Sequence, residues 1–186
     1  MSRAAETVAL IGLRCTGKSS VGRCLARLSG RPFVDLDREI ERAWAGGSVA
    51  VQRPSATPTA GELLAELGES AFRDLEESAL RAVLQCGGAP VLATGGGAVE
   101  RAACRDLLSR CRCVWLRADP RVLAARMAAD PVPRPALGSG SAADELAGLA
   151  QQREAWFVQL ACLVVESGEE EVEVLARGIL TALDLG

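Results

Sequence analysis

The sequence of 186 residues contains no histidine, and Lys18 is the only lysine among its 21 basic residues. Without histidine, a general base in a catalytic site would have to be a carboxylate. There is no CxxC pair and no histidine to complete a zinc site, so we interpret the seven cysteines as reduced core thiols. Because arginine has replaced lysine almost everywhere else, position 18 is expected to require a compact ammonium group on a flexible stem.

Long apolar runs and basic clusters are also lacking. No apolar run is long enough to span a bilayer, and the strand-like run 7–13 leaves no space before it for a secretion signal. The basic residues are dispersed and the net charge is −3, which argues against a nucleic-acid surface. We therefore expect a cytoplasmic monomer that binds a small molecule, without nucleic-acid or membrane partners.

Short apolar runs alternate with helical patterns along the chain. Strands are predicted at 7–13, 32–37, 90–94, 113–116 and 162–166, and helices at 19–29, 38–45, 62–67, 71–84, 120–129, 143–160 and 169–183. The final helix is expected to be capped by Ser167. Such alternation predicts a parallel sheet with helices on both faces and ligands at the carboxyl ends of the strands. The proline-rich segments 48–59 and 130–141 are interpreted as surface loops.

The segment 12–19, GLRCTGKS, matches the phosphate-binding pattern GxxxxGKS and lies between a predicted strand and a predicted helix. Backbone N–H groups are expected to surround the β-phosphate of ATP, while Lys18 reaches the β- and γ-phosphates and Ser19 ligates Mg²⁺. A glycine-rich turn without nucleotide would not explain this setting or the single lysine. The predicted ATP contacts in the loop are Gly12, Cys15, Thr16, Gly17, Lys18, Ser19 and Ser20.

Two acids, Asp35 and Asp37, end the second predicted strand. Alternation on a strand would turn both carboxylates to the same side, toward the phosphate site. One would then serve Mg²⁺ and the other would accept a hydroxyl proton. An equally good explanation is that the pair stabilises the N-terminus of the following helix.

Four motifs and a late arginine complete the pattern. They are DLD at 35–37, FRDLEE at 72–77, ATGGGAV at 93–99, RP at 134–135, and Arg153. With the phosphate loop, they resemble the shikimate kinase family over nearly the whole chain. The resemblance implies a P-loop NTPase-type α/β/α fold with a five-stranded parallel sheet in the order 2-3-1-4-5. It also implies ATP-dependent, Mg²⁺-dependent phosphorylation of the shikimate 3-hydroxyl, in the biosynthesis of chorismate and aromatic amino acids.

The resemblance assigns roles to the acids and to two arginines. Asp37 would hold the reacting hydroxyl and act as the base, and Asp35 would order Mg²⁺ through water. Arg73, oriented by Glu76 one helical turn later, and Arg153 would together bind the shikimate carboxylate, which suits planar guanidinium groups. Taken alone, Arg73 and Arg153 would each be read as ordinary surface charges.

Further roles follow from the glycines and the remaining arginines. Gly96, between Gly95 and Gly97, would approach the substrate and the γ-phosphate, which requires a residue without a side chain. Arg134 would close over the transferred phosphoryl group as part of a lid at 128–142, and Arg126 would flank adenine.

Within a single kinase domain, 1–186, the resemblance places a helical substrate-binding subdomain at 38–85. A loop at about 48–59 is inserted into it, and Cys15 stands where the family usually has glycine. Two alternatives are a related small-metabolite kinase such as a gluconate kinase, and a nucleotide-binding module without catalytic activity. The paired arginines argue against the first, and the retained base and arginines argue against the second.

Overall fold

The structure is a computed structural model that describes residues 6–46, 58–129 and 141–185. Most of the predicted inserted loop, the central part of the predicted lid and Arg134 therefore lie outside the described residues. None of the described helices is both long and apolar enough to cross a bilayer.

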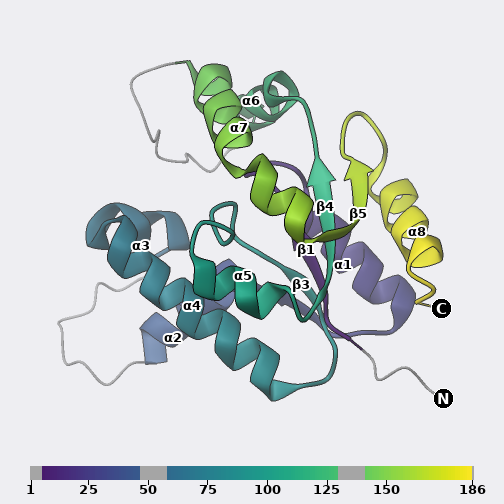
Figure 1. The fold of residues 1–186 in the computed structure, drawn as a ribbon, viewed down its shortest axis with the longest axis horizontal. Coiled ribbons are helices and arrows are strands. Elements are labelled where there is room, and N and C mark those ends of the chain that lie inside the picture. The colour runs from purple at the N-terminus through teal and green to yellow at the C-terminus, as the bar shows by residue number, and fades with distance from the viewer. Residues whose placement is uncertain (1–5, 47–57, 130–140, 186) are drawn as a thin grey trace.

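Five parallel strands form one sheet in the order β2-β3-β1-β4-β5, which confirms the predicted topology (Figure 1). Its central strand, β1, pairs with β3 and β4, so that Val8 lies opposite both Val91 and Arg112. The strands are β1 (Val8–Ile11), β2 (Phe33–Asp35), β3 (Val91–Ala93), β4 (Arg112–Arg117) and β5 (Ala161–Glu166).

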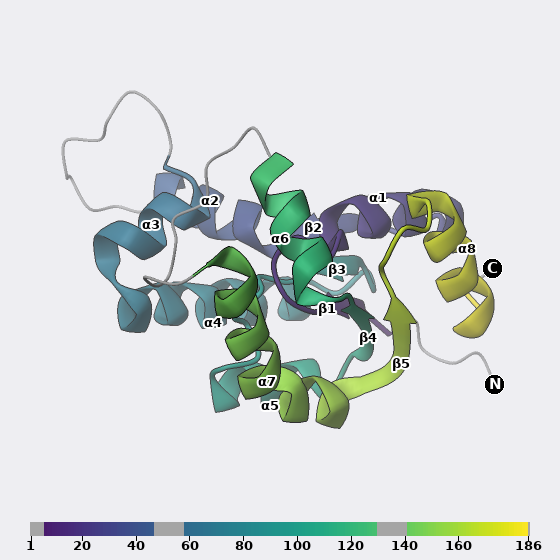
Figure 2. The same cartoon turned by 90° about the horizontal axis from the view of Figure 1, so that it is seen from above.

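Helices cover both faces of the sheet. The first and last helices lie side by side on one face, and the others pack on the opposite face or beyond its edge (Figure 2). The helices are α1 (Lys18–Ser29), α2 (Leu36–Gly46), α3 (Ala60–Leu67), α4 (Glu69–Cys86), α5 (Ala102–Leu108), α6 (Pro120–Ala129), α7 (Ala142–Leu160) and α8 (Val172–Ala182).

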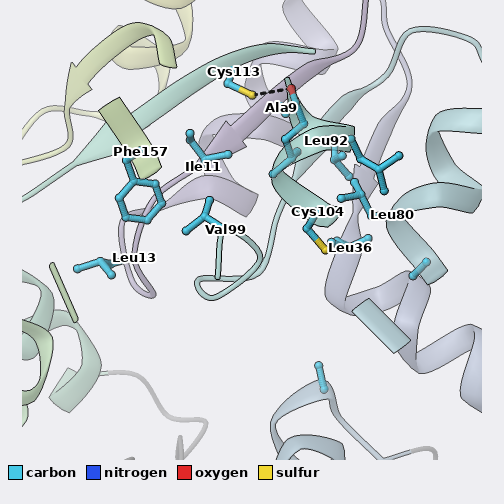
Figure 3. Close-up of a cluster of buried hydrophobic side chains, with 14 of the residues drawn as sticks. Ala9, Ile11, Leu13, Leu36, Leu80, Leu92, Val99, Cys104, Cys113 and Phe157 are labelled. Atoms are coloured by element: carbon cyan, nitrogen blue, oxygen red, sulfur yellow. Dashed lines mark hydrogen bonds between the residues drawn. The ribbon is translucent and has the colours of Figure 1, made fainter. Parts of the chain in front are cut away.

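Alternation along the strands divides the core into two layers. In β1, Val8 and Leu10 pack with α1 and α8, whereas Ala9 and Ile11 pack in the opposite cluster. That second cluster reaches the helices that carry the candidate site, and Phe157 of α7 lies within it (Figure 3). The two-residue period of the strands thus anchors helices on both faces.

The structure corrects the prediction at the second strand, because β2 ends at Asp35 and Asp37 belongs to the first turn of α2. A helix N-terminus favours acidic side chains, so the alternative that placed the acids there holds for Asp37.

The last helix was also predicted incorrectly. It begins after Glu171, and Ser167 does not cap it. The helix α5 was missed, because its seven residues present too short an apolar face to produce a clear period.

All seven cysteines are free thiols, but the description of them as core residues was only partly right. Cys104 and Cys113 are buried, and burial raises the pKa of both thiols. The others are half-buried or exposed, with Cys86 and Cys162 exposed.

Phe157 anchors α7 to the sheet, one helical turn after Arg153. Its side chain is 1% exposed and stacks on Trp115 with ring centroids 5.4 Å apart. We expect Phe157→Ala to lower the free energy of unfolding by about 3–5 kcal/mol, because it leaves a cavity at this contact. Denaturant unfolding measures the change. Val158→Ala, at a neighbouring position that is 60% exposed, should change stability by less than about 0.5 kcal/mol. Equal losses in the two variants would contradict the anchoring role.

Candidate active site

The predicted site residues gather at the carboxyl ends of three neighbouring strands. The phosphate loop follows β1, Asp35 ends β2, and the three glycines at 95–97 follow β3. Helices α4 and α7 bring Arg73 and Arg153 to this edge from distant parts of the chain. The structure therefore brings together the predicted phosphate and substrate residues, apart from Arg134, which lies outside the described residues.

Lys18 lies at the start of α1 and is only 7% exposed. Its ammonium Nζ donates hydrogen bonds to the carbonyl oxygens of Gly12, at 2.9 Å, and Leu13, at 2.6 Å. Thr16 Oγ1 lies 3.4 Å from Nζ and itself donates to the Leu13 carbonyl at 2.9 Å. The loop is thus wrapped around the ammonium group, which is held where phosphate oxygens of a nucleotide would meet it.

The loop backbone depends on conformations that favour glycine. Gly12 has φ 141°, and a β-carbon there would overlap the carbonyl oxygen of Leu116. Gly17, just before α1, has φ 85°. Cys15 has φ 64° in the left-handed region, although it carries a β-carbon. Glycine, which the resemblance leads us to expect here, would adopt this backbone without strain, and cysteine costs on the order of 1 kcal/mol.

Ser19 and Asp35 form the candidate metal-binding pair. Ser19 Oγ donates a hydrogen bond of 2.7 Å to Asp35 Oδ2, which brings two oxygen ligands together beside the phosphate loop. Mg²⁺ prefers such ligands and is usually held by few protein groups, with water and phosphate oxygens completing the shell.

Arg126 lies on the other side of the phosphate loop. Its guanidinium group donates to the carbonyl oxygens of Cys15, at 3.2 Å, and Gly168. Ser167, which follows β5, is 2% exposed and donates from Oγ to the Thr16 carbonyl at 2.7 Å. These contacts tie the loop to the segment after β5. The role of Ser167 was missed, because its position next to acids resembled a helix cap.

Arg73 and Arg153 converge on a third side chain, Glu100. Arg73 Nη2 lies 2.6 Å from Glu100 Oε2, and Arg153 donates to Glu100 Oε1 from Nε at 3.0 Å and from Nη2 at 2.5 Å. Arg153 Nη1 also donates to the carbonyl of Gly96 at 3.0 Å. Sequence reasoning missed Glu100. A signal was present, because two arginines expected at one site require counter-charges and a glutamate directly follows GGGAV.

Glu76 is the second counter-charge, and its side chain is 1% exposed. Arg73 Nη1 donates to Glu76 Oε2 at 2.8 Å, as the motif implied. Burial, opposed by Arg73, raises the pKa of Glu76 to about 7. Burial works against the charged form of Arg73, but Glu76 and Glu100 together raise the pKa of that guanidinium. Arg73 Nε and Glu76 Oε1 are buried and have no hydrogen-bond partner among the described residues.

The three consecutive glycines, 95–97, pack against three parts of the site: the carboxyl groups of Glu76 and Asp37, the phosphate loop and the guanidinium group of Arg73. A β-carbon at Gly95 would lie 2.6 Å from Glu76 Oε1 and 3.1 Å from Asp37 Oδ1. One at Gly96 would lie 2.9 Å from the backbone nitrogen of Arg14 in the phosphate loop. At Gly97 it would overlap the guanidinium group of Arg73. At Gly96 the neighbour is backbone, which leaves no space for a side chain, whereas at Gly95 and Gly97 the neighbouring side-chain ends of Glu76 and Arg73 would have to move. We call this closely packed segment, 95–97, the glycine joint.

Two cavities border these residues. One of about 330 Å³ is lined by Arg73 and Glu100 together with Glu69, Ser70, Arg101, Gln152 and Trp156. Another of about 370 Å³ lies among β4, α6 and α7 and meets the phosphate loop at Leu13 and Thr16. The smaller one contacts the arginine–carboxylate cluster, because Arg73 and Glu100 both line it.

The sheet order, the phosphate loop after β1 and the helix that opens at Lys18 define a P-loop nucleotide-binding protein of the three-layer α/β/α type. A family model described as shikimate kinase matches residues 14–184. The chain belongs to the shikimate kinase family, and as a member it is an ATP-dependent kinase.

Individual relatives agree with this family. A shikimate kinase of Caulobacter vibrioides (strain NA1000 / CB15N) is 40% identical over 182 residues, which cover 96% of this chain and 82% of that protein. The structure of a shikimate kinase from Acinetobacter baumannii in complex with shikimate has 31% identity and a TM-score of 0.82, with coverage of 96% and 92%. A gluconokinase from Sinorhizobium meliloti 1021, at 18% identity, TM-score 0.56 and coverage of 98% and 93%, shares the fold alone. The comparisons thus support the shikimate kinase family over the gluconate alternative.

Cys15 provides a test of the phosphate loop. We expect Cys15→Gly to change the affinity for ADP by less than about fivefold. The backbone strain at Cys15 is about 1 kcal/mol, and only the part of it that differs between the free and the ADP-bound loop changes the affinity. The greater freedom of glycine in the unfolded chain offsets part of the gain in stability. Isothermal titration of ADP measures the affinity. Cys15→Ala, which keeps the β-carbon, should match the wild type, and a change above tenfold in Cys15→Gly would contradict this account.

The raised pKa of Glu76 predicts a pH-dependent stability. Above its ordinary pKa of 4.5 the unfolded chain loses this proton, whereas the folded protein holds it until about pH 7. The free energy of unfolding should therefore fall as pH rises from about 5 to 7, by up to about 3 kcal/mol from this group. In thermal or denaturant unfolding, Glu76→Gln should not show this fall in stability. Glu77→Gln, which changes the partly exposed neighbouring residue, should still show it. Parallel profiles for wild type and Glu76→Gln would exclude this origin.

Proposed function

We propose that the protein transfers the γ-phosphate of ATP to the 3-hydroxyl of shikimate. The observation that carries the proposal is the convergence of Arg73 and Arg153 on one carboxylate, beside a glycine joint that packs on the phosphate loop. A pair of guanidinium groups aimed at one point suits a small substrate with a carboxylate. The phosphate loop suits the other substrate, ATP.

Substrate binding places the carboxylate between the two arginines and the ring over Gly96. Arg153 is held by the Gly96 carbonyl, and Arg73 is held by Glu76. Each guanidinium group is therefore oriented before the substrate arrives. This lowers the loss of conformational entropy on binding. Because the guanidinium groups fix one end of the ring, the hydroxyls at the other end are directed toward the phosphate loop.

Asp37 acts as the base for the reacting hydroxyl. It lies at the N-terminus of α2 and faces Gly95 next to Glu76. With no histidine in the sequence, a carboxylate is the available acceptor for the proton. The buried Glu76 holds Arg73 and is the positioning residue for that arginine.

Lys18 exchanges the loop carbonyls of Gly12 and Leu13 for β- and γ-phosphate oxygens when ATP binds. Ser19 and Asp35 would hold Mg²⁺, Asp35 through water as the resemblance implies, and the metal would supply neutralisation of charge on the phosphates. The resemblance assigns Arg134, which lies outside the described residues, to the transferred phosphoryl group, and Arg126 to the adenine. Positioning and electrostatic stabilisation supply most of the rate. That the protein acts as a cytoplasmic monomer stays a prediction.

The proposal is tested by ADP release from ATP and Mg²⁺ with and without shikimate. We expect turnover that depends on shikimate, and no such dependence on gluconate. Asp37→Asn should lower kcat by about 10²- to 10⁴-fold, because the proton acceptor is lost. Arg153→Lys should raise KM for shikimate by roughly 10- to 100-fold, because charged hydrogen bonds are lost.

Arg177→Lys is the matched control. Arg177 lies on α8, is largely exposed and pairs with Glu173. Its substitution should leave both constants unchanged. Absence of shikimate-dependent ADP release by the wild type would refute the proposed function.

A further inference from the structure

Glu100 occupies the position that a substrate carboxylate requires. Both of its oxygens are bound: Arg73 Nη2 contacts Oε2 at 2.6 Å, and Arg153 Nε and Nη2 contact Oε1 at 3.0 and 2.5 Å. A planar carboxylate held by two guanidinium groups is the same arrangement that carboxylate recognition would use. The protein's own side chain therefore satisfies the donors that the substrate needs.

Charge balance leads to the same conclusion. Glu100 supplies most of the negative charge beside the two guanidinium groups, because the raised pKa of Glu76 leaves that carboxyl partly protonated near neutral pH and Glu69, 3.5 Å from Arg73, is largely exposed. The arginine side chains are 12% and 7% exposed, so water screens these charges weakly. A substrate carboxylate must therefore compete with Glu100 for the same guanidinium donors.

Of the two internal carboxylates, Glu100 is the one able to leave. Glu76 is 1% exposed and lies within α4. Glu100 is 19% exposed, lies in the loop before α5 and lines the cavity of about 330 Å³. Rotation of its side chain into that cavity would bring its carboxylate toward solvent without moving a helix.

We propose that Glu100 is an internal competitor for the substrate carboxylate and sets the affinity of this site for it. This inference rests on the proposed carboxylate site of Arg73 and Arg153. In the unliganded protein Glu100 keeps the two guanidinium groups paired, and substrate binds by displacing it. Part of the interaction energy of the arginines is then used to displace Glu100, so the substrate binds more weakly than two free arginines would allow.

The test is isothermal titration of the full chain with shikimate, with cyclohex-1-ene-1-carboxylate, and with the uncharged cyclohex-1-ene-1-carboxamide. Glu100→Gln keeps the shape of the side chain and removes its charge. We expect this variant to bind both carboxylates at least fivefold more tightly than the wild type and the amide within twofold. In turnover it should lower KM for shikimate by at least fivefold.

Glu154→Gln is the matched control. Glu154 follows Arg153 in the chain, is exposed, and its charge raises the pKa of Arg117. It removes the same net charge and should change every affinity by less than twofold. Glu100→Asp, with a shorter reach, should bind carboxylates more tightly than the wild type but less tightly than Glu100→Gln. This variant provides a second measurement should Glu100→Gln unfold.

Unchanged or weaker binding of both carboxylates by the Glu100 variants would overturn the inference and make Glu100 a support for the arginines. Tighter binding of the amide as well would also overturn it, since the effect would not depend on charge. If the carboxylates bind as expected but shikimate is not turned over, the competitor role stands and the proposed function fails.

Discussion

Close packing of three consecutive glycines is the constraint on which the rest of the site depends. Gly95 faces the carboxyl groups of Glu76 and Asp37, Gly96 meets the backbone of the phosphate loop, and Gly97 lies against the guanidinium of Arg73. A single segment after β3 therefore sets the distance between the nucleotide half and the substrate half. Phosphoryl transfer requires both reactants within a few ångströms of each other, so this joint defines the geometry of the reaction.

The arginine and carboxylate cluster shows how the chain keeps charges at a buried edge. Two guanidinium groups with little exposure would be costly alone, and Glu76 and Glu100 compensate them. The two carboxylates differ in what they do. Glu76 is fixed in α4 with a raised pKa and orients Arg73, whereas Glu100 is more exposed and bridges both arginines. If the proposed function holds, stability and substrate recognition depend on the same ion pairs.

Much of this architecture is readable from the sequence because its signals are local. The phosphate loop lies between an apolar strand and a helix, and the alternation of strands and helices predicts a parallel sheet, whereas the strand order followed from the family resemblance. The contacts of Glu100 were not predictable in this way, because they arise where α4, α7 and the loop before α5 meet. Asp37 was placed on a strand because two alternating acids fit a strand end and a helix start equally well, and only the hydrogen-bonded backbone distinguishes them.

The central claim is that Arg73 and Arg153 bind the substrate carboxylate while Asp37 and the phosphate loop bracket the reacting hydroxyl. A crystal structure with ADP and shikimate tests it most directly. The account predicts a carboxylate within hydrogen-bond distance of both guanidinium groups, and the 3-hydroxyl directed toward Asp37. A shikimate whose carboxylate contacts neither arginine would contradict it.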